Sequence, residues 1–144
     1  MRGFTLIEIC LIIIIILLLS ALILPLGFNF YKRQQLQAHS QQILQTLRRA
    51  QLKAMSVELD SNFGVYITND NYTLFKGNSY DEVGRDTQYD EVFDLPQIIT
   101  VSGPSEVVFS KFEGKPNTIG NITLTSNGLT QVININEIGR INLE

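Results

Sequence analysis

Glu8 is the residue whose type and placement carry the clearest chemical implication in this chain. Residues 9–24, which follow it directly, are apolar except for Ser20, and Cys10 among them behaves as a small hydrophobe. A carboxylate beside lipid is costly to desolvate, so an ionisable residue at this place indicates a functional site by default. The alternative is a simple interfacial residue at the start of a membrane anchor.

The other residues that could do chemistry form no known constellation. The sequence holds no G-x-S-x-G, Walker or H-E-x-x-H pattern, and it has a single histidine, His39, and a single cysteine. We therefore expect no enzyme, no catalytic residue, no cofactor and no metal, with His39 on the surface of a helix. A series of carboxylates could bind calcium, but it lacks EF-hand spacing, and a solvated loop explains it better. These carboxylates are Asp81, Glu82, Asp86, Asp90, Glu91 and Asp94.

Charge is distributed unevenly around a formal net value of −3. From Glu58 onward, thirteen acidic residues stand against five basic ones. An acidic domain repels phosphate, so the composition does not favour nucleic-acid binding. Arg48, Arg49 and Lys53 lie before this region. They could touch DNA or an acidic neighbour, although a solvated helix face accounts for them more simply.

The apolar stretch that begins at Ile9 is long enough to form a membrane-spanning helix. Counted through Tyr31 it exceeds 20 residues, and one transmembrane helix needs about 17–25. Arg2 precedes the stretch and Lys32 follows it. A cleaved secretory signal peptide would have a shorter apolar stretch and a small-residue cleavage site beyond it. A plain signal anchor would have no use for the carboxylate at its start.

The apolar pattern turns helical between Phe28 and Val57. Apolar and small residues recur every three or four positions, which predicts that one face of this helix packs on a domain. We expect one helix over 4–57, with residues 4–31 in the membrane and 32–57 as its amphipathic continuation. The stripe consists of Leu36, Ser40, Ile43, Leu47, Ala50, Ala54 and Val57, widened by Leu44 and Met55. A solvated or inter-subunit face is expected for Gln34, Gln35, Gln37, Gln41, Gln42, Gln45 and Gln51.

Two residues are expected to disturb this helix. Pro25 removes a backbone donor and clashes with the carbonyl four residues back, and Gly27 loosens the same turn. We predict a kink or a locally melted stretch over residues 22–27. A harmless bend where the helix leaves the membrane is the alternative.

After Asp60 the pattern changes to short strands separated by turn residues. The clearest hairpin has Asn127-Gly128 at its tip, because Asn-Gly suits a two-residue type I′ turn. The predicted fold is α+β, with a long N-terminal helix packed on an antiparallel β head over 58–144. The predicted strands are Phe63–Thr68, Tyr72–Lys76, Val92–Leu95, Ile98–Val101, Glu106–Phe112, Asn121–Ser126, Leu129–Asn136 and Ile138–Leu143, with a polar loop over Gly77–Asp90.

Residues 3–8, Gly-Phe-Thr-Leu-Ile-Glu, resemble the N-terminal signature of type IV prepilins and type II secretion pseudopilins. The resemblance implies that a membrane-bound prepilin peptidase cuts after Gly3 and methylates the new N-terminus at Phe4. Residues 1–3 are then a short leader, and a start upstream of Met1 would lengthen it. Glycine suits the cut, because its backbone can approach the peptidase closely.

The same resemblance assigns roles to the residues after the cut. Cleavage would leave a positive amine on Phe4, and that amine can neutralise Glu8 of a neighbouring copy in an assembly. The two charges meet only when neighbouring copies are shifted by the correct distance along the helix axis. Because an unpaired charge is costly to bury, this pairing favours one arrangement of the copies. Thr5 could bond to the backbone or to Glu8, or be a tolerated small polar residue. Pro25 and Gly27 match the helix-disrupting stretch of many type IV pilins.

The C-terminal half also resembles the H-type (GspH/FimT-like) pseudopilin subgroup. The matching segments are 106–109, Gly114, 120–124 and 138–141, with 47–54 in the helix. The resemblance implies a minor pilin or pseudopilin of a type IV pilus or type II secretion-like filament. Before assembly it would be a single-pass inner-membrane protein with its head outside the cytoplasm. The implied partners are prepilin peptidase, other pilin or pseudopilin subunits, an inner-membrane assembly platform and membrane lipid. The alternative is a minor pilin that captures DNA or another surface ligand, and the sequence does not decide which filament system it serves.

Overall fold

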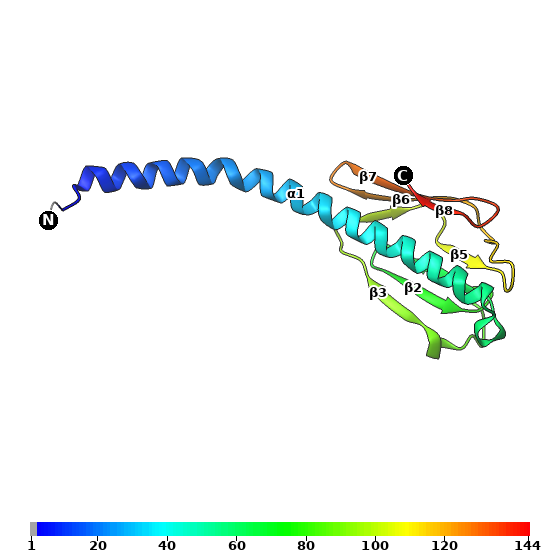
Figure 1. The fold of residues 1–144 in the computed structure, drawn as a ribbon. Helices are drawn as coiled ribbons and strands as arrows, with labels where there is room; N and C mark the ends of the chain where they lie inside the picture. Colours follow the sequence, from blue (N-terminus) through cyan, green and yellow to red (C-terminus); the bar gives the residue numbers. More distant parts are fainter. Residues whose placement is uncertain (1–2) are drawn as a thin grey trace. The chain divides into compact units, whose positions relative to one another are not determined.

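The computed structural model describes the backbone of residues 3–144 and the side chains of residues 3–21 and 30–144. In this part of the chain, one long helix, α1, is followed by eight short strands. The chain forms two compact units, Met1–Gln34 and Gln35–Glu144, and each is described by itself. Figure 1 follows the chain from the helix into the strands of the second unit.

Helix α1 spans Leu6–Met55. At its start the Thr5 carbonyl accepts hydrogen bonds from the backbone N–H groups of Glu8 at 3.1 Å and Ile9 at 3.3 Å. The carboxylate of Glu8 lies in the first turn, where the helix dipole favours negative charge. The chain leaves the helix through Val57, whose φ of 58° is left-handed. The helix predicted over 4–57 is confirmed, apart from its outermost residues at each end.

Among the residues that the structure describes, no helix carries an apolar stretch long enough to span a bilayer. Residues 22–29 of the membrane span predicted over 4–31 lie outside the described side chains. Helix α1 runs through residues 22–27, so the locally melted stretch predicted there was wrong, whereas Pro25 and Gly27 lie outside the residues whose side chains are described. The span and the kink both stay predictions.

The second unit contains two four-stranded antiparallel sheets. Figure 1 shows their strands on either side of the second half of α1. The first sheet has the order β3 (Glu91–Asp94), β2 (Asn71–Lys76), β1 (Phe63–Ile67) and β5 (Glu106–Phe109). The second has the order β4 (Thr100–Ser102), β6 (Gly120–Ser126), β7 (Leu129–Ile135) and β8 (Ile141–Leu143). Two short 3-10 turns, η1 (Glu58–Asp60) and η2 (Thr87–Tyr89), lie between elements.

The core of this unit lies between α1 and the two sheets, which confirms the α+β architecture. The predicted stripe is buried at Leu36, Ser40, Ile43, Leu44, Leu47, Ala50 and Ala54. It meets Phe63, Val65, Leu74, Val107 and Phe109 of the first sheet and Ile122, Leu124, Ile133, Ile135 and Ile141 of the second. The stripe was wrong at Met55, which is 48% exposed, and Val57 is only half-buried. Met55 is the last residue of α1, and Val57 lies beyond it in left-handed backbone.

Most predicted strands are confirmed, and the differences lie at their ends. The Asn127-Gly128 turn has φ values of 51° and 79°, both left-handed as a type I′ turn requires. The strand predicted over Ile98–Val101 was wrong at its start. The Ile99 N–H donates to the Pro96 carbonyl at 2.9 Å and closes a turn there. The strands predicted over Glu106–Phe112 and Ile138–Leu143 are shortened in the same way, because local turns occupy residues 110–114 and 136–139.

One polar side chain of α1 fastens two loops of the head. The Gln51 amide nitrogen donates to the carbonyl of Gly114 at 2.9 Å and to the carbonyl of Gly139 at 2.8 Å. A Cβ at Gly139 would lie 2.5 Å from that same nitrogen, so only glycine lets the loop approach so closely. The solvated or inter-subunit face predicted for Gln51 was therefore wrong, since its amide is half-buried and bound within its own head.

We predict that Gln51→Ala destabilises the head by about 1–3 kcal/mol, because it leaves two loop carbonyls without their donor. The matched control is Gln37→Ala, the same chemical change at an exposed position of the same helix, which should cost less than about 0.5 kcal/mol. Denaturant unfolding of the full chain in a neutral detergent would measure both. Equal effects of the two variants would contradict the assignment.

Candidate functional site

The predicted cleavage site lies in open, non-helical backbone. Gly3, Phe4 and Thr5 precede the first residue of α1, and all three are exposed. Phe4 is 72% exposed, and a Cβ built on Gly3 would meet no atom within 4 Å. Within the described chain, the peptide bond between Gly3 and Phe4 is thus sterically open to an enzyme.

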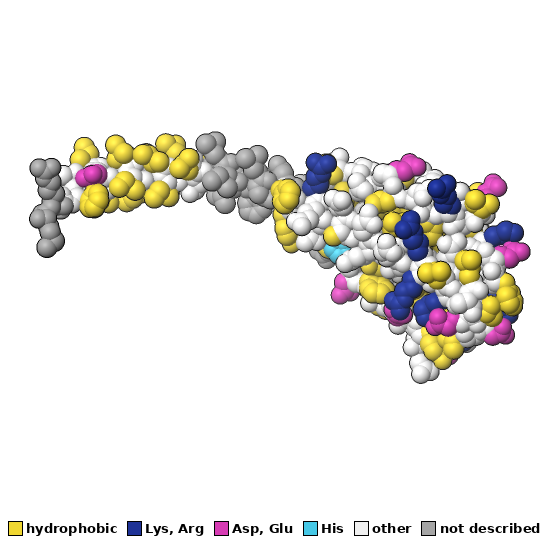
Figure 2. Space-filling model, in the orientation of Figure 1, with side chains coloured by type: hydrophobic (Ala, Val, Ile, Leu, Met, Phe, Trp, Pro, Cys, Tyr) yellow, Lys and Arg dark blue, Asp and Glu magenta, His cyan; other side chains and the backbone are white. Residues whose placement is uncertain are grey.

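The described first part of α1 is apolar and exposed on every side. Every residue from Leu6 to Ala21 is exposed. Figure 2 shows hydrophobic side chains along both edges of this helix. A helix that is hydrophobic all round is normally buried in a protein or in a membrane. Burying each large aliphatic side chain contributes about 1.5–3 kcal/mol, so this surface strongly favours a covering partner.

Glu8 is the one charged residue in the sequence of this exposed segment. The structure places Thr5 and Glu8 together in one turn, through the backbone hydrogen bond of 3.1 Å. None of the ion pairs between described residues includes Glu8. A positive group on another molecule could therefore reach this carboxylate without displacing a described one.

Three basic residues in the last two turns of α1 bind groups of their own head. Arg48 donates to the Ile141 carbonyl at 3.0 Å. The Arg49 guanidinium forms two hydrogen bonds, of 2.6 and 2.7 Å, with the carboxylate of Glu91. Lys53 forms an ion pair of 2.6 Å with Glu58. These cations are engaged within one copy, although the sequence also allowed contacts with DNA or a neighbour.

The acidic series predicted as a solvated loop is partly tied down by the chain itself. Arg85 forms an ion pair with Asp90, and its guanidinium lies 4.7 Å from the ring centre of Tyr80. The hydrogen bond to Asp90 raises the pKa of Arg85. Glu82 accepts a hydrogen bond from the Asn78 N–H at 3.0 Å, which lowers the pKa of Glu82. Among the described residues, no three acidic, histidine or cysteine side chains lie together as metal ligands would.

His39 differs from its predicted surface position. The side chain is half-buried, and among described residues its Nδ1 is buried without a hydrogen-bond partner. Burial lowers the pKa of His39, and a hydrogen bond with Gln42 acts against that shift. The folded protein therefore holds this imidazole neutral more firmly than the unfolded chain does.

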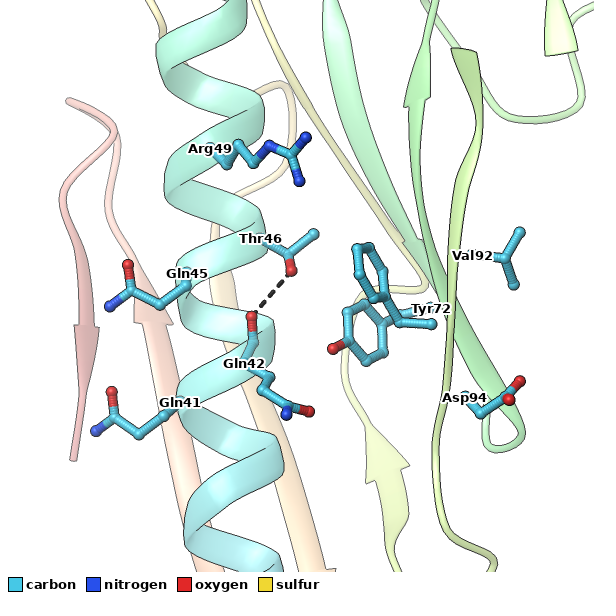
Figure 3. A pocket seen from close by; sticks show the side chains of 9 residues that line it. Gln41, Gln42, Gln45, Thr46, Arg49, Tyr72, Val92 and Asp94 are labelled. Carbon is cyan, nitrogen blue, oxygen red and sulfur yellow. Dashed lines mark hydrogen bonds between the residues drawn. The ribbon is translucent and has the colours of Figure 1, made fainter. Parts of the chain in front are cut away.

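A groove between α1 and β3 has a volume of about 640 Å³. We call it the α1–β3 groove; its residues are Gln41, Gln42, Gln45, Thr46, Arg49, Tyr72, Val92, Phe93 and Asp94. Figure 3 shows Tyr72 directed toward the helix, with the side chains of Val92 and Asp94 directed away from it. Sequence patterns did not indicate the groove, because its two walls come from segments far apart in the chain.

No protein-family model, curated protein or solved structure matches this chain. Any assignment of function therefore rests on the sequence, the geometry and the charge of the chain itself.

We predict that the head loses stability as the pH falls from about 7.5 to about 5.5, because the unfolded chain then binds a proton at His39 more readily than the folded protein. The loss begins near the ordinary histidine pKa of 6.5 and is complete below the lowered pKa of the folded state. His39→Gln removes this titration and should flatten the dependence. Denaturation midpoints of the full chain at a series of pH values test it. An unchanged slope in the variant would refute the assignment, since the sequence holds no other histidine.

Proposed function

We propose that this chain is a type IV pilin-like subunit, a minor pilin or pseudopilin that is assembled into a filament through its N-terminal helix. The observation that carries the proposal is the described first part of α1, residues 6–21, which is exposed and apolar on all sides and has one carboxylate in its first turn. Such a surface needs a continuous apolar environment. A membrane supplies that environment to a single copy, and a bundle of identical helices supplies it to an assembly.

Before assembly, the chain is a single-pass protein of the inner membrane, with residues 4–31 as its span and the head outside the cytoplasm. The sequence supports this, because the apolar stretch from Ile9 through Tyr31 exceeds 20 residues and Lys32 and Arg33 follow it. The head carries the acidic charge and the β-sheets, and it needs no lipid for its own core.

Prepilin peptidase then cuts between Gly3 and Phe4 and methylates Phe4. The open, non-helical backbone before Leu6 supports this step, because a peptidase must take hold of an extended segment. The freed amine on Phe4 is positively charged, and it can pair with the carboxylate of Glu8 on another copy, which otherwise has no counter-charge in lipid. Pairing of the two removes the burial cost of both charges at once, and it does so only at the correct stagger.

The partners follow from these steps. They are prepilin peptidase, an inner-membrane assembly platform, membrane lipid and further pilin or pseudopilin subunits. Capture of DNA by the head is less well supported, because Arg48, Arg49 and Lys53 are engaged within their own head. Salt-sensitive binding of double-stranded DNA by the full chain in detergent would reverse that preference.

We predict that protein isolated from producing cells begins at a methylated Phe4. Mass spectrometry of the N-terminal peptide measures this directly. The control is a Gly3→Leu variant, whose side chain blocks close approach of the peptidase, so that its N-terminal peptide should retain residues 1–3. Wild-type protein that keeps Met1 would remove the basis for the proposed processing.

We predict that Glu8→Leu leaves membrane insertion and cleavage intact but lowers the number of filaments at least tenfold, because the amine of a neighbour then has no counter-charge. Glu8→Asp is the matched control, since it keeps the charge, and it should assemble better than Glu8→Leu. Electron microscopy counts the filaments, and blotting of membrane fractions checks insertion. Filament numbers equal to wild type in Glu8→Leu would refute the pairing role.

A further inference from the structure

Three of the four outer sheet edges of the head are partly covered by contacts from the chain itself. At β4, the Val101 N–H donates to the side chain of Asn69 at 2.9 Å. At β8, the Ile141 carbonyl accepts from Arg48 at 3.0 Å. At β5, the following loop turns back, so that Phe109 bridges to Pro116. Exposed edges template unwanted strand pairing, and proteins commonly cover them in such ways.

The fourth edge, β3, is left open. The Leu95 N–H donates to the Asp70 carbonyl at 2.8 Å, one step beyond the Asn71–Asp94 pair of the β2–β3 register. Backbone groups alternate in direction along an antiparallel strand, so the N–H and C=O groups of Val92 and Asp94 point away from β2. Among the described residues, no hydrogen bond involves these outward groups.

The open edge borders the α1–β3 groove. On the helix side of β3, the rings of Tyr72 and Phe93 stack at 5.1 Å between centroids and form an apolar floor. Gln42 and Gln45 of α1 line the opposite wall. A groove between a helix and an unpaired strand edge suits an extended peptide, because the edge binds its backbone and the groove takes alternate side chains.

The charges at this edge indicate which kind of extended segment would bind to it. Asp94 lies on β3 and Asp70 lies beside its end, both are exposed, and neither carboxylate accepts a hydrogen bond from a described residue. Glu91, on the same strand, is already neutralised by Arg49. A second copy pairing through its own β3 would bring the same two aspartates to this edge, and like charges disfavour that arrangement.

We propose that the β3 edge and the α1–β3 groove bind an extended, positively charged peptide segment of a partner protein, which adds as a fifth strand to the first sheet. Its backbone pairs with Val92 and Asp94. Every second side chain of the peptide enters the groove next to Phe93. A lysine or arginine of the peptide pairs with the carboxylate of Asp94. The proposal does not depend on processing at the N-terminus, because no residue of the segment 3–8 takes part.

The test uses the full chain in a neutral detergent and three short, capped, fluorescent peptides, with binding measured by anisotropy. The first alternates threonine and valine and carries a lysine near each end. The second has glutamates in place of the lysines. The third is the lysine peptide with alternate backbone nitrogens methylated, which removes the donors of one edge. We expect only the first to bind well, about tenfold more tightly than either of the others.

Protein variants separate edge pairing from charge attraction. Val92→Pro removes an N–H that points away from β2, so the sheet keeps its own hydrogen bonds. This variant should weaken binding of the lysine peptide about tenfold. Val92→Thr keeps the N–H and is the matched control, which should bind as wild type does. Asp94→Asn should weaken binding by roughly threefold, as expected for an exposed ion pair.

Four results would overturn the proposal: failure of the lysine peptide to bind, equal binding of the lysine and glutamate peptides, undiminished binding of the methylated peptide, and equal affinities of Val92→Pro and Val92→Thr. If Val92→Pro instead lowers self-association of the chain while no peptide binds, the edge belongs to a second copy, and the proposal fails as well.

Discussion

The cost of leaving apolar helix surface in water governs this structure. The apolar surface of helix α1 is covered differently in the two parts of its length. From Leu36 to Ala54 it turns a single stripe toward two sheets of its own chain and buries it. From Leu6 to Ala21 it is apolar on every side, and the described chain offers nothing to cover it. The head is therefore self-contained, whereas the first segment depends on its surroundings.

Side-chain hydrogen bonds from α1 fix the positions of the strands and loops around it, while the apolar core supplies most of the buried surface. Arg48, Arg49 and Gln51 lie within one turn of the helix and bind a strand edge, a neighbouring strand and two loops in that order. The sequence contains one cysteine, so no disulfide within the chain can do this work. Side-chain hydrogen bonds from one helix take its place, and they reach both sheets.

Much of the fold followed from local sequence signals, and the departures have physical causes. The periodicity from Leu36 to Ala54 predicted the buried face, and Asn127-Gly128 predicted its hairpin, because both signals act over a few residues. The role of Gln51 and the burial of His39 could not be predicted, since each depends on contacts with distant segments. For the same reason, the α1–β3 groove had no signal in the sequence. The roles of Gly3, Phe4 and Glu8 rest on a motif, and their geometry is compatible with it.

The lengthwise arrangement of the stripe has a mechanical consequence. Leu36 to Ala54 are buried at successive turns of the helix, so a pull along the helix axis within the head acts on all of them. To slide out, the helix would have to break these contacts together, along with the Gln51 bonds to both loops. Forced unfolding is limited by the unfolding rate, so a barrier made of many simultaneous contacts gives resistance to tension that equilibrium stability alone would not reveal.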